Sequence, residues 1–250
     1  VTFSGSANQT ITQSAWFIQS ATLVVNKTAW SVTLASNLTL ASTVTLSQGT
    51  IDASTYSVTW GTLVVSWTWV LNLLNSNTIS SSLTLSWGTL NLSSGTTTFS
   101  GNFTYSSGTL NHNSGTVVFS VASSNQTISA TGWAFHNVNF TRADSSSTSL
   151  YIYLSWDMTI NGNLTVTNQN WGIWGLSIQS NTSTPRNITV AGNMSFPNTS
   201  TRLVSFGYSW AQLNVLLSWN LSIADNDAYL SSQVTFSGSA NQTITQSAWF

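Results

Sequence analysis

The sequence predicts an all-β fold of the β-solenoid type, in which short parallel strands stack as successive coils of one chain. Two observations carry this prediction. Apolar and polar residues alternate with period 2 in short runs such as 43–46, 82–85 and 163–166, each followed or preceded by Gly, Asn or Ser. The same patterns also recur along the chain at fixed offsets, which is typical of repeat architectures.

The longest repeat is an identity between two distant segments. Residues 1–17, VTFSGSANQTITQSAWF, recur as residues 234–250, so that Val1 corresponds to Val234 at an offset of 233 residues. Two interpretations fit this identity. The full protein carries many copies of a 233-residue unit, or the overlap marks where the next unit of a periodic fibre begins. Both predict an object longer than 250 residues.

A half-period lies within the 233-residue unit. FSGSANQTI, which begins at Phe3, returns as FSVASSNQTI at Phe119, and Trp16 returns as Trp133 at an offset of 117. We therefore expect a first half-repeat over 1–116, a second over 117–233, and the start of the next 233-residue repeat over 234–250.

The shortest repeat has the length of one coil. Residues 88–107 and 108–127 match at nine of twenty positions, and Gly49 precedes Gly88 by about two such steps. A unit of about 20 residues predicts six coils per half. The residues expected to point inward from one coil are Leu90, Leu92, Phe99, Phe103 and Tyr105.

The alternative fold is a series of tandem immunoglobulin-like β-sandwiches. A half-repeat of 116 residues has the size of one such domain. A sandwich does not predict a 20-residue internal similarity, and this similarity favours the solenoid.

The composition excludes several classes of function. Charged residues make up 4% of the chain, Lys27 is the only lysine, and the net charge is −1. This charge offers no electrostatic attraction for nucleic acid or for an anionic membrane. Cysteine is absent, which excludes disulfides and thiolate metal sites. No apolar run is long enough for a membrane-spanning helix, so membrane insertion is not expected.

Two stretches carry a resemblance to a known style of protein. The run VTLASNLTLASTVTLSQGTIDASTYSVT covers residues 32–59, and GTLNHNSGTVVFS covers residues 108–120. With the segment NQTIT, they resemble the tandem β-solenoid repeat regions of large secreted prokaryotic surface and adhesin-type proteins. The resemblance implies secretion and a role in adhesion, matrix or surface coating, and it supplies no catalytic residues.

The motif Asn-x-Ser/Thr is frequent, and it is the acceptor motif for N-glycosylation on exposed turns of secreted proteins. Asparagine that opens a turn before a strand beginning with threonine explains part of this frequency. Glycans would hydrate a fibre that has few charges. The candidate glycosylation sites are Asn8, Asn26, Asn37, Asn91, Asn102, Asn125, Asn139, Asn163, Asn181, Asn187, Asn193, Asn198, Asn220 and Asn241.

Tryptophan is unusually common, with thirteen residues. Several stand where repeats of this type place glycine, as in Ser86-Trp87-Gly88 and at Trp60, Trp156 and Trp219. We expect these side chains on outer ridges, where they contact neighbouring molecules or sugars.

Catalytic and metal sites are not expected. Asp225-Asn226-Asp227 lacks the glycine and distal glutamate of a calcium loop, so a solvated turn is the expectation. His112 and His136 have no ligand cluster around them in the sequence, and His112 is expected at the end of a strand. No enzyme activity and no cofactor is expected apart from covalent glycans.

Two functions remain after these exclusions. The first is a structural protein of an extracellular or cell-surface filament, whose partner is itself, either as a homopolymer or as neighbouring repeats. The second is an adhesin stalk or carbohydrate-binding module that uses exposed aromatic residues. Burial of the tryptophans favours the first and exposed flat rows of tryptophan favour the second.

Overall fold

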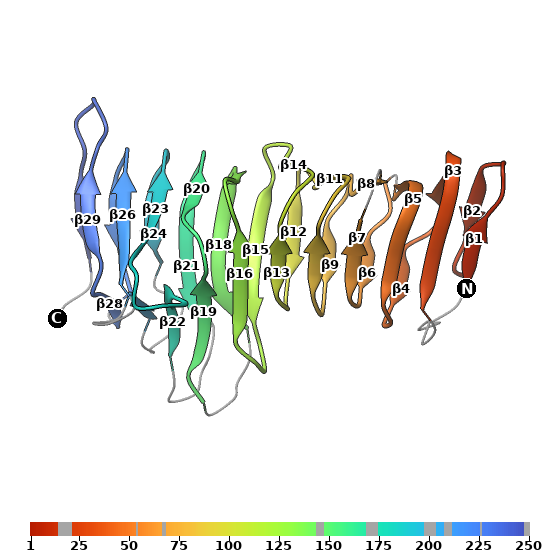
Figure 1. Cartoon of the computed structure of the whole chain (residues 1–250). Helices are drawn as coiled ribbons and strands as arrows, with labels where there is room; N and C mark the ends of the chain where they lie inside the picture. The colour runs from red at the N-terminus through yellow and green to blue at the C-terminus, as the bar shows by residue number, and fades with distance from the viewer. Residues whose placement is uncertain are drawn as a thin grey trace. The chain divides into compact units, whose positions relative to one another are not determined.

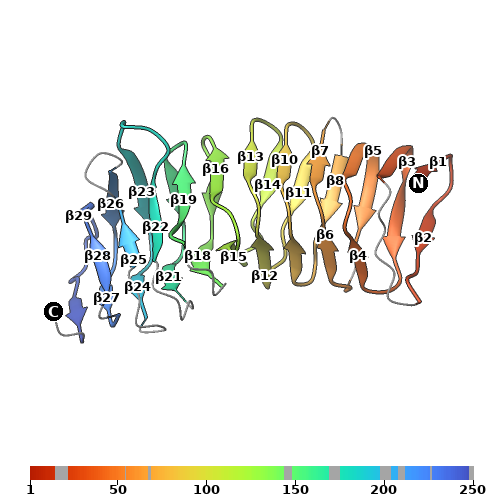
Figure 2. The ribbon, with the colours of Figure 1, turned by 90° about the horizontal axis from the view of Figure 1, so that it is seen from below.

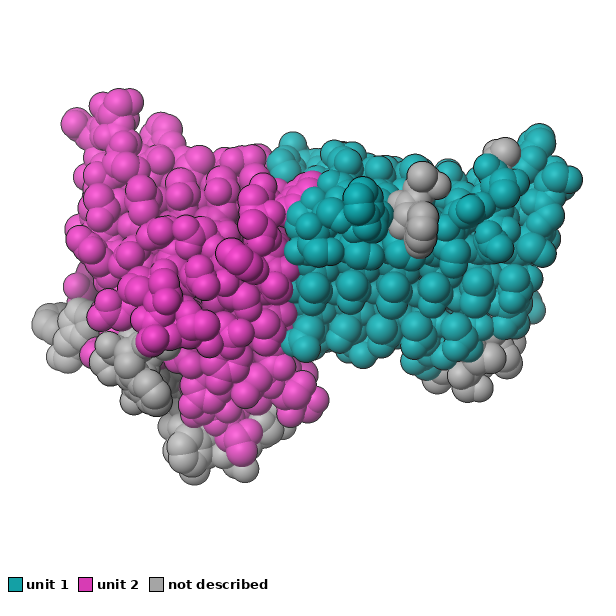
Figure 3. All heavy atoms as spheres, viewed as in Figure 1, with its two compact units in different colours: residues 1–116 teal, residues 117–250 magenta. Residues whose placement is uncertain are grey.

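The computed structural model describes residues 1–14, 22–53, 55–66, 69–143, 148–168, 175–197, 204–207, 212–225 and 227–247. Over these residues all regular secondary structure is β-strand, and every strand pair between them is parallel. The chain forms two compact units, residues 1–116 and residues 117–250, which Figure 3 shows in different colours. The predicted division of the sequence into half-repeats stays a prediction.

The described residues of unit 1 form fourteen strands. They are β1 (Thr2–Ser4), β2 (Gln9–Ile11), β3 (Leu23–Leu34), β4 (Leu38–Leu40), β5 (Val44–Asp52), β6 (Val58–Trp60), β7 (Leu63–Val65), β8 (Trp69–Asn72), β9 (Asn77–Ile79), β10 (Leu83–Leu85), β11 (Thr89–Asn91), β12 (Thr96–Phe99), β13 (Phe103–Tyr105) and β14 (Thr109–Asn111).

Unit 2 contains the remaining strands, of which the first begins on the last residue of unit 1. They are β15 (Thr116–Val121), β16 (Gln126–Ala130), β17 (Ala134–Phe135), β18 (Asn137–Arg142), β19 (Leu150–Leu154), β20 (Met158–Ile160), β21 (Leu164–Asn168), β22 (Leu176–Ser180), β23 (Arg186–Val190), β24 (Met194–Phe196), β25 (Val204–Phe206), β26 (Leu213–Leu217), β27 (Leu221–Ile223), β28 (Ala228–Leu230), β29 (Gln233–Phe236) and β30 (Ile244–Gln246).

Turns divide each coil into short strands. The strands of successive coils stack on one another and form three columns in each unit (Figures 1 and 2). In unit 1 the columns include β7–β10–β13, β8–β11–β14 and β4–β6–β9–β12, and the long strands β3 and β5 each span two of them. In unit 2 the columns are β16–β19–β22–β25–β28, β15–β18–β21–β24–β27–β30 and β17–β20–β23–β26–β29. This is a β-solenoid, so the predicted fold class is confirmed.

The register between coils separates the two candidate folds. Leu63, Leu83 and Phe103 align in successive coils of unit 1, at steps of 20 residues. Immunoglobulin-like sandwiches are built from antiparallel sheets. The sandwich alternative is therefore wrong, because the described strands pair in parallel.

Coil length differs between the units. Paired strand residues of adjacent coils in unit 1 lie 19 to 23 apart, as expected from the 20-residue repeat. In unit 2 the paired strand residues lie 23 to 30 apart, except between β26 and β29, where they lie 19 apart. The expected division of the second half into six equal coils is therefore wrong, because its coils carry longer connections between strands.

The core is formed by the inward residues of each strand, and outward residues alternate with them. Leu90, Leu92, Phe99 and Phe103 are buried as predicted, and the rings of Phe99 and Phe103 meet edge to face at 5.1 Å. The prediction was wrong for Tyr105, which is half-buried and whose hydroxyl donates a hydrogen bond to the Gly108 carbonyl at 2.9 Å. The polar end of this ring is satisfied only by remaining at the surface.

Candidate functional site

The predicted glycosylation sites lie on outward-facing positions. Every sequon asparagine in the described part of the chain is exposed or half-buried, and Asn198 lies outside it. An asparagine must reach solvent to be modified, and these positions meet that requirement. Glycosylation itself stays a prediction.

Parallel register places asparagines of successive coils one above another. On the outer face of unit 1, Asn72, Asn91 and Asn111 occupy equivalent positions of β8, β11 and β14. The Asn91 amide nitrogen donates to Asn72 Oδ1 at 2.6 Å, and the Asn111 amide nitrogen donates to Asn91 Oδ1 at 2.5 Å. We call this set the face ladder. It ties three coils together outside the core.

A second ladder runs along a corner of unit 2 and consists of Asn137, Asn163, Asn193 and Asn220, which we call the corner ladder. The side-chain oxygen of each asparagine accepts the backbone N–H of the next asparagine in the series. The N···O distance is 2.9 Å from Asn163 N to Asn137 Oδ1, 2.9 Å from Asn193 N to Asn163 Oδ1, and 3.1 Å from Asn220 N to Asn193 Oδ1. The series continues to the backbone N–H of Thr243, which lies 2.8 Å from Asn220 Oδ1. These bonds satisfy main-chain donors at a turn, where no strand partner does so.

The ladders use the two ends of the asparagine side chain differently. The amide nitrogen, which is the atom that receives a glycan, is a hydrogen-bond donor at the sequons Asn91, Asn181, Asn187 and Asn193. At Asn8, Asn37 and Asn125 the contact to the next coil is made by the oxygen instead. Asn8, Asn37 and Asn125 therefore keep their contact to the next coil when the nitrogen is modified.

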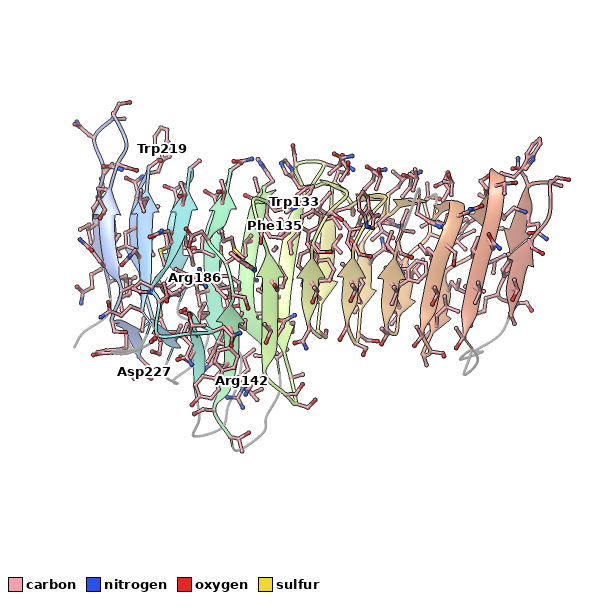
Figure 4. The ribbon with its side chains drawn as sticks, viewed as in Figure 1. Trp133, Phe135, Arg142, Arg186, Trp219 and Asp227 are labelled. Atoms are coloured by element: carbon pink, nitrogen blue, oxygen red, sulfur yellow. The ribbon has the colours of Figure 1, made fainter. Side chains whose placement is uncertain are left out.

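The described tryptophans divide between surface and core. Trp30, Trp87, Trp156 and Trp219 are exposed, as expected for outer ridges. Figure 4 shows Trp219 at the tip of β26. The prediction of an outer position was wrong for Trp60, which is fully buried, and Trp69 is fully buried as well. Trp69 begins β8, where it aligns with Gly49 of the preceding coil.

Trp156 and Trp219, the exposed tryptophans among the described residues of unit 2, do not form one row. Trp219 precedes Asn220 of the corner ladder. Trp156 lies in a different column, where the Arg186 guanidinium stands 5.4 Å from the centre of its ring. This cation–π contact holds Trp156 against the adjacent coil.

A groove of about 740 Å³ crosses unit 1 where β8, β11 and β14 begin. Trp87, which is 64% exposed, and the buried Trp69 both line it. The indole N–H of Trp69 has no hydrogen-bond acceptor among the described residues. The other lining residues are Val70, Gly88, Thr89, Gly108 and Thr109. An apolar groove with few polar groups at its rim is typical of a small-ligand site.

Two basic residues are buried rather than exposed. Lys27 donates from Nζ to Gln9 Oε1 at 2.9 Å and to the Gly5 carbonyl at 3.4 Å. Arg142 donates to the Gly175 carbonyl at 2.9 Å (Figure 4). Carbonyl oxygens thus hold both cations, and neither is available as a surface charge.

The acidic turn differs from the expectation of a solvated turn. Asp225 is buried, its Oδ1 accepts the backbone N–H of Asp227 at 2.9 Å, and burial raises its pKa above the ordinary value. Of the other two residues considered there, Asp227 is half-buried and Asn226 lies outside the described residues. The structure places no group of three or more metal-ligating side chains together within the described ranges.

The histidines lie at strand ends. His112 follows β14 directly, as expected, and its Nδ1 accepts the backbone N–H of Ser114 at 3.1 Å. His136 separates β17 from β18. In the part of the chain that the structure covers, no helix long and apolar enough to cross a membrane was found.

Comparison of the chain with models of protein families, with curated proteins and with solved structures finds no match. The site must therefore be interpreted from its own geometry.

Proposed function

We propose that this protein is a structural component of an extracellular or cell-surface filament, that it is N-glycosylated, and that it assembles by tandem repetition or end-to-end stacking. The observation that carries the proposal is a stack of parallel coils whose sequence repeats at the level of the coil, the half and the 233-residue unit. Stacked coils bury a continuous core and need a neighbour on each side, so they extend naturally in one direction.

The surface supports the same proposal. Only 4% of the residues are charged, and the outward positions of the strands are rich in threonine, serine and asparagine. A surface with so few charges needs another source of hydration, and glycans on the sequons supply it. The preferred acceptors are Asn8, Asn37 and Asn125, whose side-chain oxygen rather than amide nitrogen contacts the next coil.

Native material tests the proposal directly. Electron microscopy of the purified assembly is expected to show filaments whose coils are spaced by about 4.8 Å along the axis. Intact-glycopeptide mass spectrometry is expected to find higher occupancy at Asn37 and Asn125 than at Asn91 and Asn193. Native protein present only as isolated single chains would contradict the filament, and unmodified sequons throughout would contradict the glycans alone.

A second function is favoured by the groove at Trp87. An indole ring presents a flat apolar face for the C–H face of a sugar ring, and the hydroxyls of Thr89 and Thr109 stand at the same groove. The ligand class would be a neutral oligosaccharide, which suits a site that lacks charged residues. In this case the protein acts as an adhesin stalk that binds carbohydrate.

Replacement of Trp87 tests this second function. If the groove binds sugar, Trp87→Ala is expected to weaken binding tenfold or more, because the stacking surface is lost. Titration of the full chain with neutral gluco-, manno- and chito-oligosaccharides, followed by tryptophan fluorescence, measures the effect. Trp30→Ala is the matched control, since Trp30 is also an exposed tryptophan of unit 1 but lies outside the groove. Equal affinities for both variants, or no binding by the unaltered chain, would exclude the sugar site.

A further inference from the structure

We propose that residues 234–247 form a docking edge for the coil of residues 22–40 of a further repeat, so that consecutive repeats join as one uninterrupted parallel stack. The inference rests on the proposed filament and specifies its junction. It follows from the two identical segments, which make different contacts in the two places where they occur.

The first copy contacts the coil that follows it. Residues 1–14 form β1 and β2, and both strands pair in parallel with β3, where Thr2 aligns with Val24. The backbone N–H of Val24 donates to the Val1 carbonyl at 2.8 Å, and that of Ala35 donates to the Ile11 carbonyl at 2.9 Å.

Side chains of the first copy also face the following coil. Asn8 Oδ1 accepts the backbone N–H of Ser31 at 3.1 Å. Gln13 Oε1 accepts the backbone N–H of Thr39 at 3.0 Å. The oxygens of this segment therefore serve the coil formed by residues 22–40.

The second copy contacts the coil that precedes it. Residues 234–247 contribute to β29 and β30, which pair in parallel with β26 and β27. Figure 1 shows β29 beside β26. The backbone N–H of Ser237 donates to the Leu217 carbonyl at 2.9 Å, and the backbone N–H of Thr243 donates to Asn220 Oδ1 at 2.8 Å. The second copy thus contacts the preceding coil through its backbone N–H groups, whereas the first copy contacts the following coil mainly through its oxygen atoms.

One glutamine shows that the two sets of contacts are compatible. In the first copy, Gln9 Oε1 accepts from Lys27 Nζ at 2.9 Å. In the second copy the same residue is Gln242, and its Nε2 donates to the Leu217 carbonyl at 3.0 Å. A carboxamide has separate acceptor and donor ends. A single side chain in this position can therefore bind the preceding and the following coil together.

The second copy leaves apolar surface uncovered. Ile244 is 62% exposed, whereas Ile11, which is the same residue of the repeat, is half-buried beside β3. An exposed strand edge with apolar side chains is a site for pairing with another strand. The coil of residues 22–40 is the occupant for which this edge already has a demonstrated fit, because the first copy pairs with that coil.

A register-specific disulfide tests the docking edge. The chain has no cysteine. We append a copy of residues 18–60 after Phe250 and introduce Thr235→Cys together with Val24→Cys in the appended copy. Thr2 and Val24 are register neighbours, so the two new cysteines are expected to form a disulfide in most molecules on mild oxidation.

The matched control moves one cysteine by one residue. Val25→Cys in the appended copy places the thiol on the opposite face of the strand, in the core. It is expected to form at least tenfold less disulfide with Thr235→Cys. Equal cross-linking of both pairs, or none in either, would overturn the proposal.

Amide hydrogen exchange checks the same edge without cysteines. Peptides that begin within residues 220–233 and extend into the second copy identify it unambiguously. Exchange over 234–247 is expected to slow at least tenfold when the native copy of 18–60 is appended, and not when a scrambled version is appended. Slowing by both sequences would count against the proposal. Filaments in native material without this pairing would contradict only the proposed junction. Pairing without filaments in native material would contradict only the proposed filament.

Discussion

Replacing Phe119 with alanine is expected to destabilise the protein by about 3–5 kcal/mol, the usual cost of removing a buried phenylalanine side chain. Phe119 is fully buried on β15. Its ring lies 5.7 Å from that of Phe135 and 5.9 Å from that of Phe140, so one substitution removes contacts to two other strands. Denaturant unfolding followed by circular dichroism measures the effect as a lower transition midpoint.

The control for this substitution lies on the surface of the same unit. Tyr229 is 58% exposed, so Tyr229→Ala is expected to change the free energy of unfolding by less than about 0.5 kcal/mol. Similar midpoints for the two variants would mean that the core of unit 2 is not packed around Phe119.

Replacing Gly101 with alanine is expected to have the second large effect, a loss of about 3 kcal/mol, at the upper end of the usual cost of overpacking. A Cβ atom at this position would overlap the backbone carbonyl of Ser81 in the preceding coil. The three nearest atoms all belong to the Ser81 backbone, so the two coils must separate locally. Thermal unfolding of the variant measures the loss.

Gly95 provides the matched control in the same unit. The nearest atoms to a Cβ there are the hydroxyls of Ser93 at 3.3 Å and Ser76 at 3.4 Å, and a serine side chain can move by a few tenths of an ångström. Gly95→Ala is therefore expected to be close to neutral, because the entropy lost by the unfolded chain offsets the small contact. An equal loss for Gly95→Ala and Gly101→Ala would contradict close coil approach as the cause.

The regular coils of unit 1 could be predicted because their length is nearly constant. The pairs Leu90/Leu110 and Gly88/Gly108 stand 20 residues apart in the sequence and align in the structure. The coils of unit 2 could not be predicted in this way. Asn163 and Asn193 are 30 residues apart and Asn193 and Asn220 are 27 apart, so no fixed offset reveals the corner ladder.

The site was predicted in part. The Asn-x-Ser/Thr motif identifies the exposed asparagines, but it does not show which end of the Asn91 or Asn37 side chain contacts the next coil. That distinction depends on register. The groove was missed because its floor is Trp69, a residue that the sequence alone does not mark as buried.

The hydrogen bonds between coils point along the direction of stacking, and this gives the protein a mechanical character. A pull along the stack loads the bonds between one coil and the next, so coils detach one after another rather than all together. Each detached coil releases about 65–80 Å of chain in unit 1, where register pairs lie 19 to 23 residues apart, and about 65–100 Å in unit 2, where they lie 19 to 30 apart. A fibre built in this way lengthens stepwise under load and absorbs work before it breaks.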